Sequence, residues 1–404
     1  MSPKYDVTMI GGGIIGLATA LQLAARFPSL KMAVVEKETE LASHQTGHTS
    51  GVIHSGIYYR PGSLKARLCV AGGRLLKDFC DQHNIKYQLT GKVIVATDQA
   101  ELPALETLHH RGTANEVEGL EMIGTERLRE LEPHTSGVKA LYAPKTGTVD
   151  FQEVARAYAA EIRGKGVEIL TGAKVVAIAR SDSGLRLATT RGEVSTAHLI
   201  NCAGLYSDTI AKMAGLRPDI RIIPFRGEYY QLASRREHLA RGLIYPVPNP
   251  RLPFLGVHFI RMFNGGVEAG PNAVLALARQ GYRKRDIHLG ELLGTLAFPG
   301  FWAMATRHWR TGLGEVYRSL SKKAFARSLQ RLVPEIQSQD LTPGGAGVRA
   351  QAVNRRGILL DDFSIVESEN AIHVLNAPSP AATASLAIGQ HIAGLAGKSF
   401  ALAP

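Results

Sequence analysis

The chain has 404 residues, 45% of them hydrophobic, and this length predicts two or three domains around a large core. Its three cysteines lie far apart without metal-ligand spacing, which excludes a disulfide framework and favours a reducing compartment. Lys and Arg outnumber Asp and Glu by 47 to 35, which fits an anionic cofactor and substrate. Nucleic acid is not an expected partner, because no recognised nucleic-acid-binding motif accompanies the charge. No signal peptide and no long apolar run is visible, which predicts a cytoplasmic protein without a transmembrane helix.

The first thirty-six residues carry a dinucleotide-binding pattern. Residues 5–10 form an apolar run typical of a buried strand, an apolar helix follows, and residues 32–35 form a second apolar run that ends at Glu36. The turn between the first strand and the helix reads G-x-G-x-x-G, with its glycines at Gly11, Gly13 and Gly16. Such a turn lets backbone N–H groups and the helix N-terminus approach a pyrophosphate, while Glu36 can accept hydrogen bonds from a ribose.

The segment that follows distinguishes between two dinucleotides. Residues 43–51 are rich in Ser, Thr, Gly and His, whereas a simple NAD domain would usually continue directly into its next helix. Small side chains and backbone donors can run along the pyrophosphate and the ring of a flavin. We therefore expect FAD, with NAD as the alternative.

The middle of the chain predicts a mixed organisation. A helix is expected over residues 65–82, strands over 87–97, a mostly helical stretch over 102–132 and an amphipathic helix over 152–165. The apolar strand at 199–204 would return the chain to a position beside the first strand. Alternating strands then predict an antiparallel sheet, at residues 228–232, 242–247, 256–263 and 266–270.

The last part of the chain becomes glycine-rich again from residue 341, and strands and a final apolar helix at 381–395 follow. The sequence thus predicts an α/β protein with a discontinuous, Rossmann-like FAD-binding domain and a second, antiparallel-sheet substrate domain. We expect the FAD-binding domain to contain residues 1–86, 145–221 and 341–404, and the substrate domain to contain residues 87–144 and 222–340.

The whole chain resembles a known family through five motifs. They are Gly11-x-Gly13-x-x-Gly16, Thr49–Tyr59, Asn201–Gly204, Gly270–Ala273 and Asn376–Thr383. The chain is similar to the L-2-hydroxyglutarate dehydrogenases/oxidases of the D-amino-acid-oxidase-like FAD superfamily. This resemblance implies FAD, oxidation of L-2-hydroxyglutarate to 2-oxoglutarate, and electron transfer to a membrane quinone or to oxygen. Another small substrate of the same superfamily, such as glycerol 3-phosphate or an amino acid, is the alternative.

Oxidising a 2-hydroxy acid needs a base for the hydroxyl proton, and a neutral histidine suits this task near pH 7. His54 follows the small-residue segment, and His258 lies on a predicted strand of the substrate domain, so both are candidate catalytic residues. A dicarboxylate also needs cationic partners and hydrogen-bond donors. The candidate substrate-binding residues are Tyr58, Tyr59, Arg226, Asn272 and Arg349.

Reduced flavin carries negative charge, which the N-terminus of the final helix, expected at residues 381–383, could stabilise. The full set of expected cofactor-binding residues is Gly11, Gly13, Ile14, Ile15, Gly16, Glu36, Lys37, Thr46, Thr49, Ser50, Gly51, Val175, Ala203, Gly204, Gly347, Ala381, Ala382 and Thr383.

Residues 282–332 combine apolar and basic side chains. Leu292, Leu293, Phe301 and Trp302 belong to a largely apolar part, and Arg and Lys residues flank it on both sides. This pattern predicts a peripheral contact with the inner face of the cell membrane, and an ordinary helical subdomain with a solvated basic face is the alternative.

Overall fold

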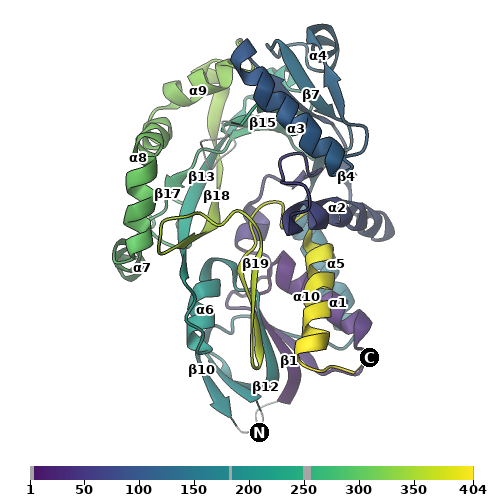
Figure 1. Ribbon diagram of the computed structural model, residues 1–404, viewed down its shortest axis with the longest axis vertical. Helices are drawn as coiled ribbons and strands as arrows, with labels where there is room; N and C mark the ends of the chain where they lie inside the picture. The colour runs from purple at the N-terminus through teal and green to yellow at the C-terminus, as the bar shows by residue number, and fades with distance from the viewer. Residues whose placement is uncertain (1–3, 182–183, 249–255, 404) are drawn as a thin grey trace.

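The computed structural model describes residues 4–181, 184–248 and 256–403, which form two lobes, each built on its own sheet (Figure 1). The described strands of the first lobe form an eight-stranded sheet in which β20, β12, β1, β2 and β9 run parallel. Its strands are β1 (Lys4–Ile10), β2 (Met32–Val35), β9 (Glu168–Leu170), β10 (Val175–Ser181), β11 (Gly184–Thr189), β12 (Gly192–Asn201), β19 (Ser364–Ser368) and β20 (Ala371–Asn376).

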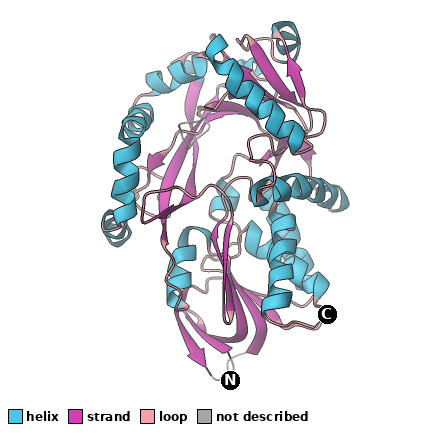
Figure 2. Ribbon diagram, in the orientation of Figure 1, coloured by secondary structure: helices cyan, strands magenta, loops and turns pink. Residues whose placement is uncertain are grey.

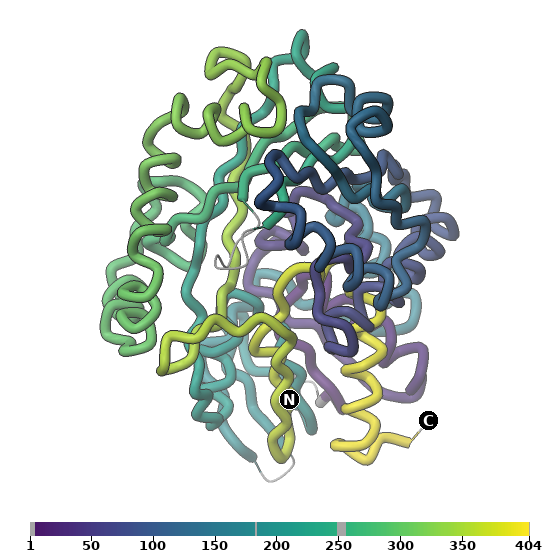
Figure 3. Tube along the Cα trace, turned by 45° about the horizontal axis from the view of Figure 1, so that its top comes forward, coloured from purple at the N-terminus to yellow at the C-terminus, as the bar shows by residue number. Residues whose placement is uncertain are grey.

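The first sheet confirms the predicted discontinuous, Rossmann-like arrangement. Its strands come from three distant parts of the chain, which lie side by side as purple, teal and yellow segments in Figure 3. The predicted return of the chain beside the first strand is also correct, because β12 pairs with β1 and Leu199 lies opposite Thr8.

Alternation along these strands produces two apolar layers. Val7 and Met9 on β1 face one core cluster, whereas Ile10, of the opposite parity, belongs to another. Helices α1, α5 and α10 pack in the first cluster, and α6 covers the other face (Figure 2). Gly389 on α10 allows close packing, since a Cβ there would lie 2.6 Å from the carbonyl oxygen of Ala18. The helices of this lobe are α1 (Ile14–Arg26), α2 (Leu64–Gln82), α5 (Phe151–Gly164), α6 (Ser207–Met213) and α10 (Ser385–Ser399).

The second lobe is built on a largely antiparallel sheet, as predicted, and only the β14–β5 pair is parallel among its described pairs. The strand order is β17-β13-β16-β15-β14-β5-β7-β6, with β18 beside β13. Its strands are β5 (Lys92–Ala96), β6 (Glu121–Ile123), β7 (Lys139–Ala143), β13 (Ile220–Leu232), β14 (Leu243–Pro246), β15 (His258–Arg261), β16 (Val267–Gly270), β17 (Val274–Leu275) and β18 (Leu341–Asn354). A third, small sheet contains β3 (Val52–Ile53), β4 (Tyr87–Gln88) and β8 (Gly147–Val149).

The structure differs from two sequence expectations here. The expected boundary at residue 341 is not a change of sheet, because β18 pairs with β13 along nearly its whole length. The expected helical stretch at 102–132 is interrupted by β6, because the chain turns at Gly119, whose φ is +69°, and then pairs with β7. The helices of this lobe are α3 (Leu102–Ala114), α4 (Thr125–Leu131), α7 (Leu289–Leu296), α8 (Pro299–Leu320) and α9 (Lys322–Gln330). Short 3₁₀ turns are η1 (Gln45–His48), η2 (Gln99–Glu101), η3 (Gly204–Tyr206), η4 (Ser234–Leu239) and η5 (Ser338–Asp340).

A buried ion pair joins the two lobes. The carboxylate of Asp208 on α6 accepts from the Arg279 guanidinium, with Nη2 at 2.9 Å from Oδ2, and their side chains are 1% and 6% exposed. Arg279 also donates to the carbonyl of Leu205, and Asp208 accepts from the N–H of Ile222 on β13. Because the ion pair is buried and joins one lobe to the other, this contact helps to fix how the two sheets meet.

We predict that Asp208→Ala lowers the free energy of unfolding by about 3–5 kcal/mol, because it leaves the Arg279 charge buried and unpaired. Urea unfolding of the holoprotein, followed by circular dichroism, measures this. Arg355→Ala is the matched control, since Arg355 pairs with Asp219 at 3.4 Å while both side chains are at least 70% exposed. The control substitution should lower the free energy of unfolding by at most about 1 kcal/mol. Equal losses for the two variants would contradict the prediction.

Candidate active site

The glycine turn after β1 allows two backbone segments to approach at contact distance. Gly11 has φ +115°, and a Cβ there would lie 2.4 Å from the carbonyl oxygen of Cys202. A Cβ at Gly16 would lie 2.0 Å from the carbonyl oxygen of Gly11. Only glycine fits either position, so the turn packs tightly against the end of β12.

The turn leaves the start of α1 open to an anion. The N-cap residue Gly13 provides no side-chain cap, and the first helical turn contains no acidic residue. Thr46 Oγ1 accepts from the N–H of Ile14 at 3.0 Å. The remaining first-turn N–H groups and the positive end of the helix dipole suit a pyrophosphate.

Glu36 lies at the end of β2, where the sequence pattern predicts it. Its carboxylate accepts from the N–H of Gly12 at 2.7 Å and from the N–H of Glu38 at 2.9 Å. The side chain thereby holds the glycine turn against β2 and keeps a carboxylate at the wall of the cavity described below.

One cavity of about 680 Å³ extends from the glycine turn to both candidate catalytic histidines. This volume is in the usual range for a cofactor site. Nearly all the predicted site residues line it: Gly11, Gly13, Ile14, Ile15, Glu36, Lys37, Thr46, Thr49, Ser50, His54, Val175, Ala203, Gly204, His258, Asn272, Gly347, Arg349, Ala381, Ala382 and Thr383.

Five predicted residues do not line the cavity: Gly16, Gly51, Tyr58, Tyr59 and Arg226. The two glycines shape the backbone behind the wall. The structure corrects the expectation for Arg226, whose guanidinium instead pairs with Glu228 at 3.1 Å and donates to the carbonyl of Arg283.

Asn272 reaches the wall, but its amide already makes internal hydrogen bonds. Its Oδ1 accepts from the N–H of Glu228 at 2.7 Å, and its Nδ2 donates to Glu228 Oε2 at 2.9 Å. Asn272 therefore shapes the wall and has little remaining capacity to donate to a substrate.

His54 and His258 approach the same end of the cavity from opposite lobes. His54 precedes a turn after β3, and its Nε2 lies 3.2 Å from Ser379 Oγ. His258 begins β15, its Nδ1 lies 2.9 Å from the carbonyl oxygen of Gly256, and its ring stacks 3.7 Å from the ring of Tyr245. Since a carbonyl only accepts, Nδ1 carries the proton and Nε2 of His258 remains an acceptor.

Both histidines are held in the neutral form. Burial is the largest cause that lowers the pKa of His258, to about 3, and the nearby charges of Lys92 and Arg349 act in the same direction. Burial also lowers the pKa of His54 well below its usual value, with further contributions from Lys92, His258 and Lys65. A neutral imidazole is the form that accepts a proton.

Arg349 comes to the cavity on β18, within the second sheet. Burial lowers the pKa of its guanidinium, and the hydroxyl groups of Tyr229 and Tyr59 act in the opposite direction. Two residues before it, Gly347 passes η1 so closely that a Cβ would lie 2.5 Å from the carbonyl oxygen of His48. This close approach brings a cation of the second sheet to the cofactor side of the cavity.

The final helix starts later than the sequence predicts. Its first residue is Ser385, and residues 381–383 instead form turns stabilised by bonds such as the one from Ala381 N to the carbonyl of Pro378. Prolines at 378 and 380 hold these turns outside the helix. Thr383 still reaches the site, because its Oγ1 donates to the carbonyl of Val52 and accepts from the N–H of His54.

Sequence reasoning missed several residues at the histidine end. Tyr229 and Tyr245 line the cavity, and Lys92 lies against Tyr245. Tyr245 stands on a correctly predicted strand, where pairing with β15 places it beside His258. The lysine at the start of an otherwise apolar strand, Lys92–Ala96, was the available signal for a buried charge.

Comparisons with known proteins assign the family. The profile of the family described as FAD dependent oxidoreductase (DAO) matches residues 6–395. The chain belongs to this family. FAD, the predicted cofactor, is thus confirmed, and the uncapped start of α1, the close glycine contacts and the carboxylate of Glu36 all fit it.

Three relatives in this FAD-dependent family are similar over nearly the whole chain. The chain is 52% identical to the L-2-hydroxyglutarate dehydrogenase of Indibacter alkaliphilus, over 98% of this chain and 100% of the relative. Identity is 46% with the enzyme of the same name from Escherichia coli K12, covering 96% and 92% of the two chains. It is 44% with the mitochondrial one from Bos taurus, covering 96% and 88%. The resemblance to L-2-hydroxyglutarate dehydrogenases is therefore confirmed.

Solved structures in the comparison support the fold. L-alpha-glycerophosphate oxidase from Mycoplasma pneumoniae, with FAD bound, superposes with a TM-score of 0.78 at 24% identity, covering 98% of this chain and 94% of that one. Glycine oxidase from Geobacillus kaustophilus gives a TM-score of 0.70 at 18% identity, covering 98% and 95%. Both matches extend over both lobes of this chain, because they cover 98% of it.

We predict that Gly16→Ala abolishes stable FAD binding, because the new Cβ would meet the Gly11 backbone and move the turn away from the cofactor. The flavin-to-protein absorbance ratio after gel filtration should fall by about tenfold or more. Gly164→Ala is the control, since a Cβ there meets nothing within 4 Å. A yellow Gly16→Ala protein with an unchanged ratio would refute the assignment.

Proposed function

We propose that this protein oxidises L-2-hydroxyglutarate to 2-oxoglutarate and passes the electrons to a membrane quinone or to oxygen. The observation that carries the proposal is the 44–52% identity, over nearly full length, to proteins named for this activity. FAD, when bound, supplies the acceptor for the hydride that leaves the substrate carbon. The glycine turn, Thr46 and Glu36 would hold its pyrophosphate and ribose.

His258 is the proposed base. Its Nδ1–H is fixed on the carbonyl of Gly256, so its Nε2 lone pair is directed to accept the hydroxyl proton as the carbon loses hydride. The burial that keeps His258 neutral also excludes the water that would compete for this position. Arg349, on the adjoining wall, provides the cation for the carboxylate next to the reacting carbon.

Anaerobic reduction of the purified yellow protein tests the substrate. L-2-hydroxyglutarate should bleach the flavin absorbance, whereas D-2-hydroxyglutarate, glycerol 3-phosphate and glycine should not. Reoxidation by a quinone analogue or by oxygen then identifies the acceptor. Bleaching by glycerol 3-phosphate or glycine alone would replace the proposed substrate.

We predict that His258→Gln lowers kcat/KM for L-2-hydroxyglutarate by about 10²–10⁴-fold, because the proton acceptor is lost. The pKa of His258 is lowered to about 3, so the imidazole stays neutral and kcat/KM should not fall through this group between pH 8 and pH 6. Steady-state rates across this pH range measure both effects. A larger loss in His54→Gln than in His258→Gln would assign the base to His54 instead.

A membrane contact is the second part of the proposal. Helices α7 and α8 lie along one edge of the molecule (Figure 1) and expose large apolar side chains there. After the kink of α8 at His308, the exposed apolar residues Trp309, Leu313, Val316 and Leu320 follow the spacing of one helix face. The exposed apolar side chains of both helices are Trp302, Trp309, Leu313, Val316 and Leu320 on α8, together with Leu289 and Leu293 on α7. We call these seven residues the apolar edge.

Basic side chains surround the apolar edge. Arg283, Lys284 and Arg285 are exposed before α7, and Arg310 and Lys323 are exposed along α8 and α9. Apolar groups bordered by cations suit the interface of an anionic lipid bilayer. In the part of the chain that the structure describes, no helix combines the length and hydropathy required to cross a bilayer.

The structure corrects one detail of the predicted membrane segment. Phe301 is 9% exposed and packs with Ile223, Met304 and Val353, so it belongs to the core and not to the contact surface. The exposed Trp309 and Leu313 are the better probes of membrane binding.

We predict that the double variant Trp309→Ser, Leu313→Ser binds anionic phospholipid vesicles at least about tenfold more weakly, because two large side chains no longer enter the interface. Vesicle co-sedimentation measures this, and 0.5 M salt should also weaken binding of the unchanged protein. Val176→Ser is the control, because Val176 is 48% exposed on β10 in the first lobe. Unchanged sedimentation of the double variant would exclude the apolar edge as the contact.

A further inference from the structure

Lys92 is a buried cation without an anion. It opens β5, and 2% of its surface is exposed. Its ammonium group lies 4.1 Å from the centre of the Tyr245 ring and 5.2 Å from that of Tyr58. It makes no hydrogen bond or ion pair with the residues in the described ranges. Burying a charge without a partner costs free energy, so a position of this kind implies an anion that arrives later.

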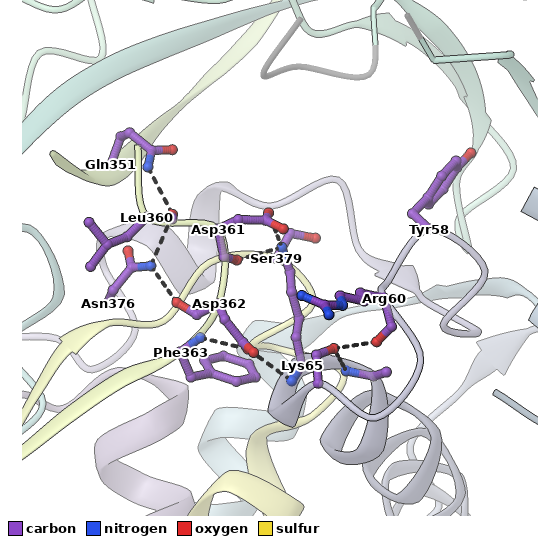
Figure 4. Close-up of polar contacts among 12 residues, drawn as sticks. Tyr58, Arg60, Lys65, Gln351, Leu360, Asp361, Asp362, Phe363, Asn376 and Ser379 are labelled. Carbon is purple, nitrogen blue, oxygen red and sulfur yellow. Dashed lines mark hydrogen bonds and ion pairs between the residues drawn. The ribbon is translucent and has the colours of Figure 1, made fainter. Parts of the chain in front are cut away.

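Tyr58 provides a second unused donor beside Lys92. Its hydroxyl group is buried and has no hydrogen-bond partner among the described residues. Figure 4 shows the Tyr58 side chain directed away from the Lys65 cluster and toward the strands of the second sheet. A phenol and an ammonium group together supply the donors that a carboxylate accepts.

These two donors lie behind the wall of the cavity at its histidine end. Neither Lys92 nor Tyr58 lines the cavity, but both pack against the ring of Tyr245, which does line it and lies 3.7 Å from the ring of His258. An anion at Lys92 would therefore contact the same tyrosine that packs against the proposed proton acceptor.

The neighbouring lysine is already paired. Lys65 Nζ lies 2.9 Å from Asp361 Oδ1 and donates to the Asp361 carbonyl, as Figure 4 shows. Its backbone N–H is bonded to Asp362, so the whole residue fastens α2 to the loop before β19. Lys65 therefore has a carboxylate partner, whereas Lys92 has none among the described residues.

We propose that Lys92, together with the hydroxyl of Tyr58, receives the second carboxylate of a dicarboxylate substrate and determines the preference over monocarboxylates. This inference rests on the proposed oxidation of L-2-hydroxyglutarate. Arg349 binds the carboxylate beside the reacting carbon, and Lys92 binds the one at the far end of the chain. The distance between the two cations then selects the length of the substrate.

The proposal has a pH signature. Burial lowers the pKa of Lys92 to about 7, so the unliganded group loses its proton, and its attraction for a carboxylate, as pH rises through this value. The groups that face it are His54, His258, Lys65, Cys69, Tyr58 and Tyr245. Burial lowers the pKa of both histidines and raises that of Cys69 to about 12 and those of Tyr58 and Tyr245 further, so these five groups do not titrate near pH 7.

Two ligand pairs and three variants of the holoenzyme test the proposal. Binding of glutarate and of pentanoate, followed by the perturbation of the flavin spectrum, compares a dicarboxylate with its monocarboxylate analogue without turnover. The kcat/KM values for L-2-hydroxyglutarate and L-2-hydroxypentanoate give the same comparison for the reaction. The variants are Lys92→Met, Tyr58→Phe and, as the matched control, Lys65→Met.

Lys92→Met should lower glutarate affinity and kcat/KM for L-2-hydroxyglutarate by about 10²-fold and leave the monocarboxylates nearly unchanged. Tyr58→Phe should show the same selectivity with about a tenfold loss. Glutarate affinity of the unchanged enzyme should decrease above pH 7, and Lys92→Met should lack this decrease. Lys65→Met should retain the ratio between the two ligands in each pair.

Two results would overturn the proposal: an unchanged ratio between the members of a ligand pair in Lys92→Met, or a ratio that changes as much in Lys65→Met. Removing an unpaired buried charge should not prevent folding, and Tyr58→Phe tests the same site independently. If the unchanged enzyme fails to oxidise L-2-hydroxyglutarate, the proposed function fails, whereas the glutarate and pentanoate comparison still decides the role of Lys92.

Discussion

The structure depends on backbone segments that pass each other at contact distance where β1 ends. The carbonyl of Gly11 occupies the space of a Cβ at Gly16, and the carbonyl of Cys202 occupies that of a Cβ at Gly11. This packing locks the first turn against β12 and places the N-terminus of α1 at the cavity, where Gly13 provides no side-chain cap and Thr46 accepts only from the N–H of Ile14. The absence of side chains at these glycines leaves the backbone N–H groups of the turn accessible to an anionic cofactor. The carboxylate of Glu36 stabilises the turn by accepting from the N–H of Gly12.

The chemistry lies where distant segments of the chain meet. Thr383, near the end of the chain, accepts from the N–H of His54, while β18 carries Arg349 from the second sheet past η1 at Gly347. His258 arrives on β15, which belongs to the same second sheet. Each lobe therefore contributes one histidine, and their relative position depends on how the lobes pack. The buried pair of Asp208 and Arg279 makes that packing rigid, because separating the lobes would leave both charges unpaired.

Patterns within short stretches of the sequence predicted the strands, helices and turns of both lobes. The glycine spacing, the strand periodicity and Glu36 were sufficient for the Rossmann-like lobe, and strand alternation predicted the second sheet. Charge pairing was not predicted, because the linear pattern does not say which neighbouring carboxylate an arginine will contact in the folded chain. Arg226 was expected at the substrate, yet Glu228 two positions later neutralises it, and Phe301 was expected at a membrane, yet β13 and β18 cover it. Lys92 was missed because a lysine that begins an apolar strand is usually a solvated strand end.

Which buried cations have carboxylate partners indicates their roles better than the overall excess of basic residues does. Lys65 and Arg279 are buried cations that pair with carboxylates, an exposed one on Asp361 and a buried one on Asp208, and they fasten elements of the fold together. Lys92 is buried equally well, but in the described part of the chain it has no carboxylate partner, and its ammonium group lies against the rings of Tyr58 and Tyr245. Burying this charge without a partner costs free energy. An unpaired buried charge of this kind is compensated when an anionic ligand binds beside it. Burial keeps His54 and His258 neutral before the substrate arrives, and the charge of Lys92 acts on the pKa of each histidine in the same direction.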